Sequence, residues 1–136
     1  MKEVIIVDGL GCPMNNKTLQ GVVKCARERP KSLIILVNGE KGYDWRVGKT
    51  SGGKWMEITL GQDFGIENPI IVEENVKTAD GAITRSREIL EKRGLLEGVL
   101  SIIIFCQFEK VKEIRSRAEK VFKGKGIQVF ALPGNH

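Results

Sequence analysis

VIIVDGLG, residues 4–11, is the stretch that decides the fold, because an unbroken apolar run leads directly into a glycine-rich turn. A continuous apolar run, in contrast to an alternating one, is typical of a strand that is covered on both faces. The sequence therefore predicts an amino-terminal strand over Val4–Val7 that is buried on both sides and followed by a tight turn.

Four further runs of the same kind follow, separated by segments with helical periodicity. The predicted strands are Leu33–Val37, Pro69–Val72, Leu100–Phe105 and Ile127–Leu132. The predicted helices are one that carries Leu19–Ala26 and stops at Pro30, a weaker one over Trp55–Phe64, one that opens at Thr78 and ends at Lys92–Gly94, and one over Val111–Phe122. This alternation predicts one Rossmann-like α/β domain over residues 1–136: a doubly wound, mainly parallel five-stranded sheet flanked by about four helices.

Composition excludes several classes of protein. The chain has 136 residues, 41% of them hydrophobic, and no apolar run approaches the ~20 residues that cross a bilayer. The amino terminus lacks the pattern of a secretory signal, and Cys12, Cys25 and Cys106 form no disulfide framework, so we expect a reduced, cytoplasmic setting without a membrane. Since the one histidine is His136, a His-based triad or a multi-His metal site is excluded.

A formal net charge of +5 favours anionic partners. The scarcity of aromatic residues argues against sequence-specific nucleic-acid binding. Nonspecific binding through the basic residues of 110–125 stays open, but Glu109, Glu113 and Glu119 favour a plain solvated helix face there.

Candidate site residues follow the carboxyl ends of the predicted strands, where open parallel sheets bind ligands. Glycine turns let backbone amides approach an anion, and the polar stretch 39–54, too glycine-rich for a helix or strand, supplies a basic loop that either covers the ligand or merely aids solubility. Glu73 and Glu74 form a carboxylate pair suited to acid–base chemistry or to holding a cation. The alternative is a strand-end glutamate that only bonds neighbouring backbone amides. The candidate ligand-binding residues are Gly9, Gly11, Asn15, Asn38, Gly39, Thr78 and Asp80, the last two also readable as a helix cap and a dipole partner.

Two phosphate-binding motifs are incomplete. Gly9-Leu10-Gly11 begins GxGxxG, but Met14 replaces the third glycine, which argues against a dinucleotide site. Residues 48–54 fit GxxxxGK, but Trp55 stands where a Ser or Thr would hold magnesium, which argues against an ATPase.

The order of these pieces resembles the YdcF/SanA/ElyC-type family of bacterial α/β proteins. The resemblance rests on VDGLG at 7–11, Asn38-Gly39-Glu40 after the second strand, Gly65-Ile66, and VEENVKTADGA at 72–82. It implies a Rossmann-like fold and either a role in envelope biology or the binding of a nucleoside-type ligand. The family's Asn, His and Arg positions are Gly81, Glu109 and Lys112 here, which adds Lys112 to the candidate ligand-binding residues.

Two functions are therefore expected. In the first, the domain binds a small anionic or nucleotide-like molecule at the carboxyl edge of its sheet, with a hydrolytic or transfer step in which Glu73 or Glu74 is the base. In the second, the family site is degenerate, and the domain is a non-enzymatic scaffold or an oligomeric, partner-binding module. A homo-oligomer is compatible with both, and the sequence identifies no cofactor.

Overall fold

Strands and helices alternate along the chain as the sequence predicts. A computed structural model describes residues 2–8, 16–37, 52–74, 76 and 79–134, and for residues 16, 17, 52, 79 and 80 it describes the backbone alone. Within these ranges the strands are β1 (Glu3–Asp8), β2 (Leu33–Val37), β3 (Ile70–Glu73), β4 (Ser101–Cys106) and β5 (Gln128–Pro133). The α-helices are α1 (Asn16–Glu28), α2 (Gly52–Gln62), α3 (Ala79–Lys92) and α4 (Val111–Val121), with short 3-10 helices η1 (Leu96–Gly98) and η2 (Phe108–Lys110).

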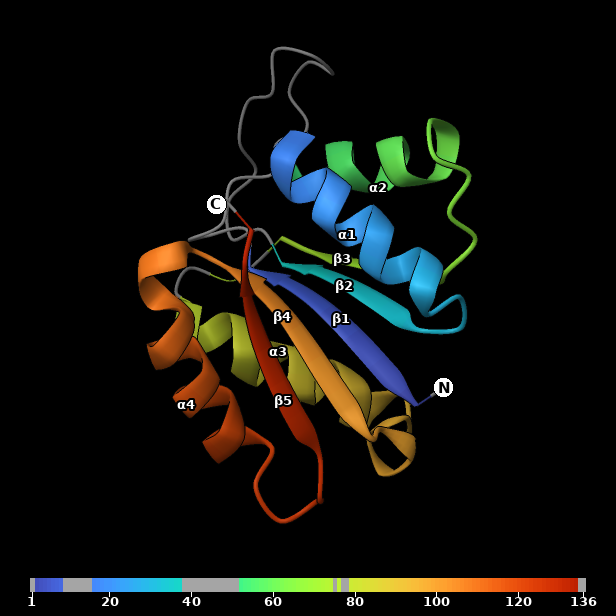
Figure 1. The fold of residues 1–136 in the computed structure, drawn as a ribbon. Coiled ribbons are helices and arrows are strands. Elements are labelled where there is room, and N and C mark those ends of the chain that lie inside the picture. Colours follow the sequence, from blue (N-terminus) through green and yellow to red (C-terminus); the bar gives the residue numbers. More distant parts are fainter. Residues whose placement is uncertain (1, 9–15, 38–51, 75, 77–78, 135–136) are drawn as a thin grey trace.

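The five strands form one parallel sheet in the order β3-β2-β1-β4-β5. Helices α1 and α2 cover one face of the sheet, and α3 and α4 cover the other (Figure 1). The expected doubly wound α/β fold is thus confirmed. Because β1 is the middle strand, it is hydrogen-bonded on both edges and covered on both faces.

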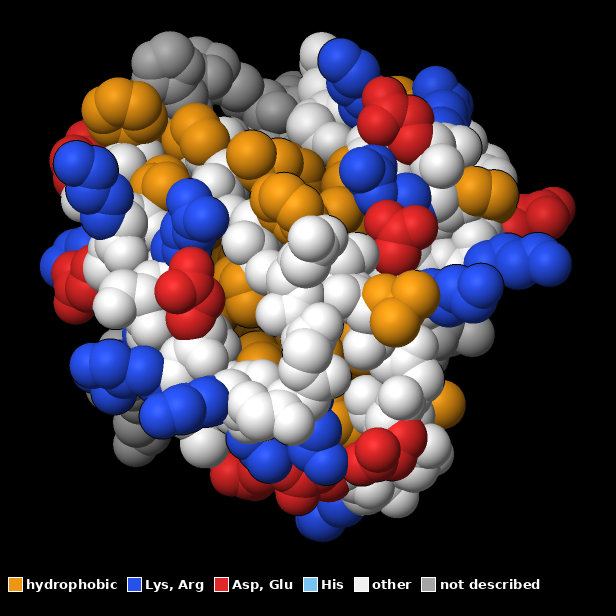
Figure 2. Space-filling model, turned by 60° about the horizontal axis from the view of Figure 1, so that its bottom comes forward, with side chains coloured by type: hydrophobic (Ala, Val, Ile, Leu, Met, Phe, Trp, Pro, Cys, Tyr) orange, Lys and Arg blue, Asp and Glu red, His pale blue; other side chains and the backbone are white. Residues whose placement is uncertain are grey.

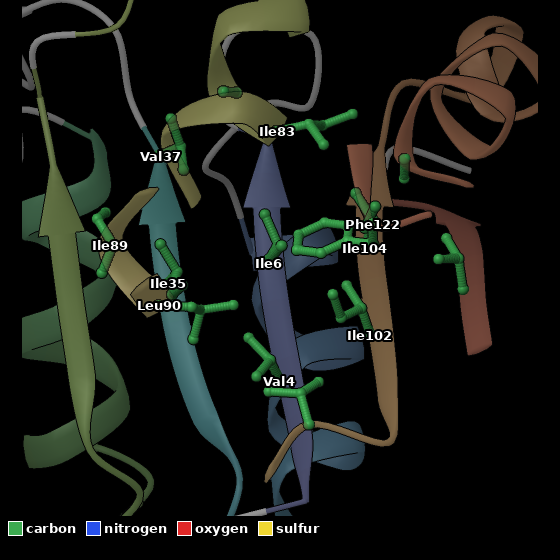
Figure 3. Packing of buried hydrophobic residues seen from close by; sticks show 14 of the residues in the cluster. Val4, Ile6, Ile35, Val37, Ile83, Ile89, Leu90, Ile102, Ile104 and Phe122 are labelled. Carbon is green, nitrogen blue, oxygen red and sulfur yellow. The ribbon is translucent and has the colours of Figure 1, made fainter. Parts of the chain in front are cut away.

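The side chains of β1 divide the core into two halves. Residues 4–7 are all 0% exposed, and their side chains alternate between the two faces of the sheet. Val4 and Ile6 join the cluster beneath α3 and α4, where Ile104 and Phe122 gather around Ile6 (Figure 3). Ile5 and Val7 join the cluster beneath α1 and α2. A polar residue at any of these four positions would be buried without water, which explains the unbroken apolar run.

The helix limits follow local signals in the sequence. Helix α1 ends at Glu28, before Pro30, and its buried side chains include Leu19, Val22 and Ala26 at helical spacing. After α3, Gly94 adopts a φ of 67°, which favours glycine, and the next amide, Leu95 N, bonds back to Leu90 O.

Some predicted limits are wrong by a few residues. Gly52–Lys54, assigned from composition to the polar loop, form the first turn of α2, because burial of Trp55 and Met56 against the sheet favours a longer helix. Leu100, assigned to a strand, precedes β4 and is 58% exposed, with its amide bonded to Lys2 O. The apolar side chain of Leu100 predicts a buried strand residue, but the sequence does not show that this position is left exposed before the strand begins.

Basic side chains on α4 and just before its start form ion pairs with carboxylates of the same helix. Lys110 bonds Glu113 at 3.3 Å and Arg115 bonds Glu119 at 3.1 Å, both on exposed side chains. These pairs favour the solvated-face interpretation of this basic segment over a nucleic-acid surface.

None of the helices in the described ranges is long and apolar enough to span a membrane.

We expect the replacement Ile6→Ala to lower the free energy of unfolding by about 2–5 kcal/mol, because it opens a cavity in the middle strand. Urea denaturation followed by circular dichroism measures this loss. The exposed Leu100→Ala is the control and should change stability by less than about 0.5 kcal/mol. Equal losses in the two variants would contradict the assignment of β1 to the centre of the core.

Candidate functional site

The connections that leave β1 and β4 run to opposite faces of the sheet. Helix α1 follows β1 on one face, whereas η2 and α4 follow β4 on the other (Figure 1). Because β1 and β4 are neighbours, the two connections separate at their carboxyl ends, and open α/β sheets bind ligands at such a point. The fold therefore assigns the candidate site to this edge.

Long-range hydrogen bonds join the start of α1 to the carboxyl ends of β4 and β5 at this point. Thr18 Oγ1, in the first turns of α1, donates to the carbonyl oxygen of Gly134 at 2.8 Å. The amide of Gly134 donates in turn to Cys106 O, also at 2.8 Å, which joins the end of β5 to the end of β4. Thr18 is 1% exposed, so this hydroxyl is structural and fixes the helix start relative to the strand ends.

Asp8, the last residue of β1, is the buried carboxylate of this edge. It is 2% exposed and lies opposite Val37, the last residue of β2. A buried carboxylate needs hydrogen-bond or charge partners, and Asp8 takes part in such interactions. An acceptor fixed at the end of the middle strand can orient a hydroxyl or amino group of a ligand.

A second acidic group lies at the end of β3, at one side of the sheet. Glu73 Oε2 accepts a hydrogen bond from Arg85 Nε on α3 at 3.2 Å, and the Glu73 side chain is 12% exposed. Arg85 also bonds Glu88, and these two carboxylates, Glu88 first, raise the pKa of Arg85. Glu73 is thus held in place by a cation that remains charged.

Glu74 lies one residue beyond β3 and faces a different cation. Lys54 Nζ, on the first turn of α2, bonds Glu57 Oε1 at 2.6 Å. That hydrogen bond, with a smaller attraction from Glu74, raises the pKa of Lys54. Glu73 and Glu74 therefore share one strand end but interact with helices on opposite faces of the sheet.

Several predicted site residues lie outside the described residues. These are Gly9, Gly11, Asn15, Asn38, Gly39 and Thr78, together with most of the basic stretch 39–54. Of Asp80 the structure describes the backbone, in the first turn of α3. Lys112 is exposed in the first turn of α4, on the β4 side of the edge.

The described candidates share the carboxyl edge but are spread along it. Strands are spaced by about 4.8 Å, so the end of β3 lies about 10 Å from the end of β1 and about 14 Å from the end of β4. Glu73 and Glu74 are therefore close to each other but not to Lys112. One ligand can contact the strand ends of β3 and β1 together only if it is about 10 Å long.

Three contributors were not singled out from the sequence as site residues. Asp8 lies in the quoted stretch 4–11 but is not among the predicted site residues, although a lone acidic residue that ends a buried apolar run is a usable signal. Thr18 gave no signal, since its partner Gly134 is 116 positions away. Arg85 is one of many basic residues on helices, and only the fold shows that it reaches Glu73.

Within the described ranges no three His, Cys, Asp or Glu side chains are grouped so as to hold a metal ion. Cys25 and Cys106 are buried, and burial raises the pKa of the Cys25 thiol.

Comparison of the sequence with protein-family models and with curated proteins gave no match.

We expect Thr18→Val to lower the free energy of unfolding by about 1–3 kcal/mol, because the buried carbonyl of Gly134 loses its donor while the side-chain volume is kept. Thr18→Ser, which keeps the hydroxyl, should lose less. Thermal or urea denaturation compares the stability of the two variants. A Val variant as stable as the Ser variant would show that the hydroxyl does not hold the start of α1 against the end of β5.

Proposed function

We propose that this domain binds a small, anionic, nucleotide-like molecule at the carboxyl edge of its sheet. The observation that carries the proposal is the separation of the β1 and β4 connections to opposite faces, with the buried carboxylate of Asp8 at that point. This is where doubly wound sheets offer an open crevice, with helix amino termini directed toward it.

The charges of this edge favour a ligand with both hydrogen-bond donors and negative charge. Asp8, Glu73 and Glu74 are acceptors suited to the hydroxyl and amino groups of a nucleoside. Lys54 and Lys112 bring positive charge from α2 and α4. A bare inorganic anion would meet the carboxylates without satisfying them, whereas a nucleotide presents both kinds of group.

The distance between strand ends along the carboxyl edge also favours a ligand as long as a nucleotide. A molecule that contacts the ends of β1 and β3 together must span about 10 Å, two strand spacings. A nucleotide reaches this far, and a single phosphate does not.

We also propose, on the resemblance described above, that the chain is related to the YdcF/SanA/ElyC-type proteins. The position of Glu73 at the end of β3 and of Ala79 at the start of α3 supports this, because the motif VEENVKTADGA requires a strand end followed by a helix start.

A hydrolytic or transfer step would use Glu74 as the base. Glu73 Oε2 accepts a hydrogen bond from Arg85, which fixes the orientation of this carboxylate and suits a positioning role. Glu74 would take the proton of the attacking water or hydroxyl. The oxygen of that water or hydroxyl would bond to the reacting centre while the bond to the leaving group breaks.

The alternative is a non-enzymatic scaffold or partner-binding domain with a degenerate family site. The observation in its favour is that Phe130 and Leu132 on β5 are 47% and 42% exposed, which is unusual for neighbouring large apolar side chains on one strand face.

Calorimetric titration with AMP, and separately with inorganic phosphate, tests the binding proposal. We expect AMP to bind at least 10-fold more tightly than phosphate, a difference of about 1.4 kcal/mol. Gly39→Val should weaken AMP binding by a similar factor, because a branched side chain blocks close approach to the backbone. The control Gly61→Val lies near the carboxyl end of α2, where an added Cβ meets nothing within 4 Å.

Absence of heat with AMP, or equal affinity for AMP and phosphate, would contradict a nucleotide-like ligand. Equal weakening by Gly39→Val and Gly61→Val would contradict the position of the site.

Phosphate release from AMP tests the catalytic step. If wild type is active, Glu74→Gln should lower the rate by about 10²-fold or more, the usual contribution of a general base. Glu113→Gln, an exposed carboxylate on α4, is the control and should leave the rate unchanged. A fully active Glu74→Gln variant would remove Glu74 from the mechanism, and absence of turnover with intact AMP binding would favour a binding protein.

A further inference from the structure

The two edges of the sheet are protected unequally. The β3 edge is short: the strand has four residues, follows Pro69 and ends at Glu73, and the next residue, Glu74, is also charged. Short length, proline and charge are the devices that keep an edge strand from pairing with another chain. β5, at the other edge, has six residues, Gln128–Pro133, and none of them is charged.

The outward backbone groups of β5 form a defined pattern. The amide of Gln128 bonds Leu100 O, just before β4, and the amide of Gly134 bonds Cys106 O, at the end of β4, so the even-numbered amides of β5 face β4. Amides alternate in direction along a strand, and those of Val129 and Ala131 therefore face the open edge. Pro133, the next outward residue, has no amide hydrogen, which ends the pairing edge at that point.

The side chains of β5 add an apolar surface to this edge. Phe130 and Leu132 lie on the α1 side of the sheet and are 47% and 42% exposed. They border a hollow of about 420 Å³ whose other walls include Ile103, Phe105 and Gly21. At Gly21 an added Cβ would lie 3.1 Å from the Phe105 ring, so α1 packs closely against the sheet here. Figure 2 shows hydrophobic side chains gathered through the middle of the face in view, with charged side chains on both flanks.

We propose that β5 pairs antiparallel with β5 of a second copy of this chain, so that two sheets join across a two-fold axis at Ala131. The two Ala131 residues would exchange a pair of backbone hydrogen bonds, and each Val129 amide would donate to the partner's Pro133 carbonyl. The proline thus lies where its missing amide costs one bond per copy.

This pairing also matches the apolar side chains to each other. With Ala131 on the axis, Phe130 of each copy lies directly opposite Leu132 of the other copy. The two side chains of each pair lie on the same face of the joined sheet. The two most exposed apolar residues of the strand cover one another, and no charged residue of β5 is buried. A second copy fits this edge because the strand is complementary to itself, and an isologous contact of this kind closes as a dimer.

The solution mass of the wild type is the first test. Sedimentation equilibrium at about 100 µM, a concentration that populates dimers of micromolar affinity, should give twice the 15.1 kDa of one chain. The double variant Phe130→Lys/Leu132→Lys should give 15.1 kDa. The control Leu100→Lys/Phe108→Lys replaces two apolar residues outside β5 that are 58% and 51% exposed, and it should remain dimeric.

Disulfide trapping tests the register in folded protein. In a Cys12→Ser background, Ala131→Cys should cross-link on mild oxidation, because a hydrogen-bonded antiparallel pair places its Cα atoms about 5.5 Å apart, within disulfide range. Gln128→Cys, on the same strand, would lie about 20 Å from its counterpart and should not cross-link.

A wild type of 15.1 kDa, including one that binds only a foreign β-strand, would overturn the proposal. So would a β5 double variant that stays dimeric, or cross-linking of Gln128→Cys as readily as Ala131→Cys. These readouts require no ligand, so they are independent of the proposed nucleotide site.

Discussion

Burial of β1 on all four sides is the constraint from which the rest of the structure follows. Val4–Val7 exchange hydrogen bonds with β2 and β4 and are completely buried under helices on both faces. A strand in that position must be apolar throughout, and each parallel neighbour must be reached by a crossover helix. Right-handed crossovers from β1 to β2 on one face and from β4 to β5 on the other then make the two connections separate at the carboxyl ends of β1 and β4.

This constraint places chemistry at one edge and leaves another edge open. At the carboxyl edge, Asp8 is fixed at the end of the most buried strand, and Glu73 is fixed by Arg85 about 10 Å away, so the proposed ligand is extended and carries several functional groups. At the side of the sheet, β5 receives cover from α4 on one face, while the other face keeps Phe130 and Leu132 exposed. Ligand binding and self-association would thus use separate parts of the same sheet.

The sequence predicts the elements well because burial patterns are local. The range Leu33–Val37 and the limits of α3 at Lys92 agree with the structure, since an apolar run and a Lys-Arg-Gly ending depend on neighbouring residues alone. Strand order, the Thr18–Gly134 bond and the Arg85–Glu73 pair depend on residues distant in the chain and leave no periodic trace. The misassignment of Gly52–Lys54 has a related cause, because glycine content predicts a loop while burial of Trp55 determines a helix. For the candidate site, the sequence predicts the edge and the pair Glu73 and Glu74 as candidates, whereas the burial of Asp8 becomes visible only in the fold.

Contacts between backbone protons across β1 test the central claim most directly. In a nuclear magnetic resonance spectrum of the labelled protein, the account predicts parallel-strand contacts from Ile5 to both Ile34 and Ile103, following the registers of β1 with β2 and β4. Contacts to one neighbour alone, or the close α-proton pairs of antiparallel strands, would contradict it, because the carboxyl ends would then no longer meet at one edge.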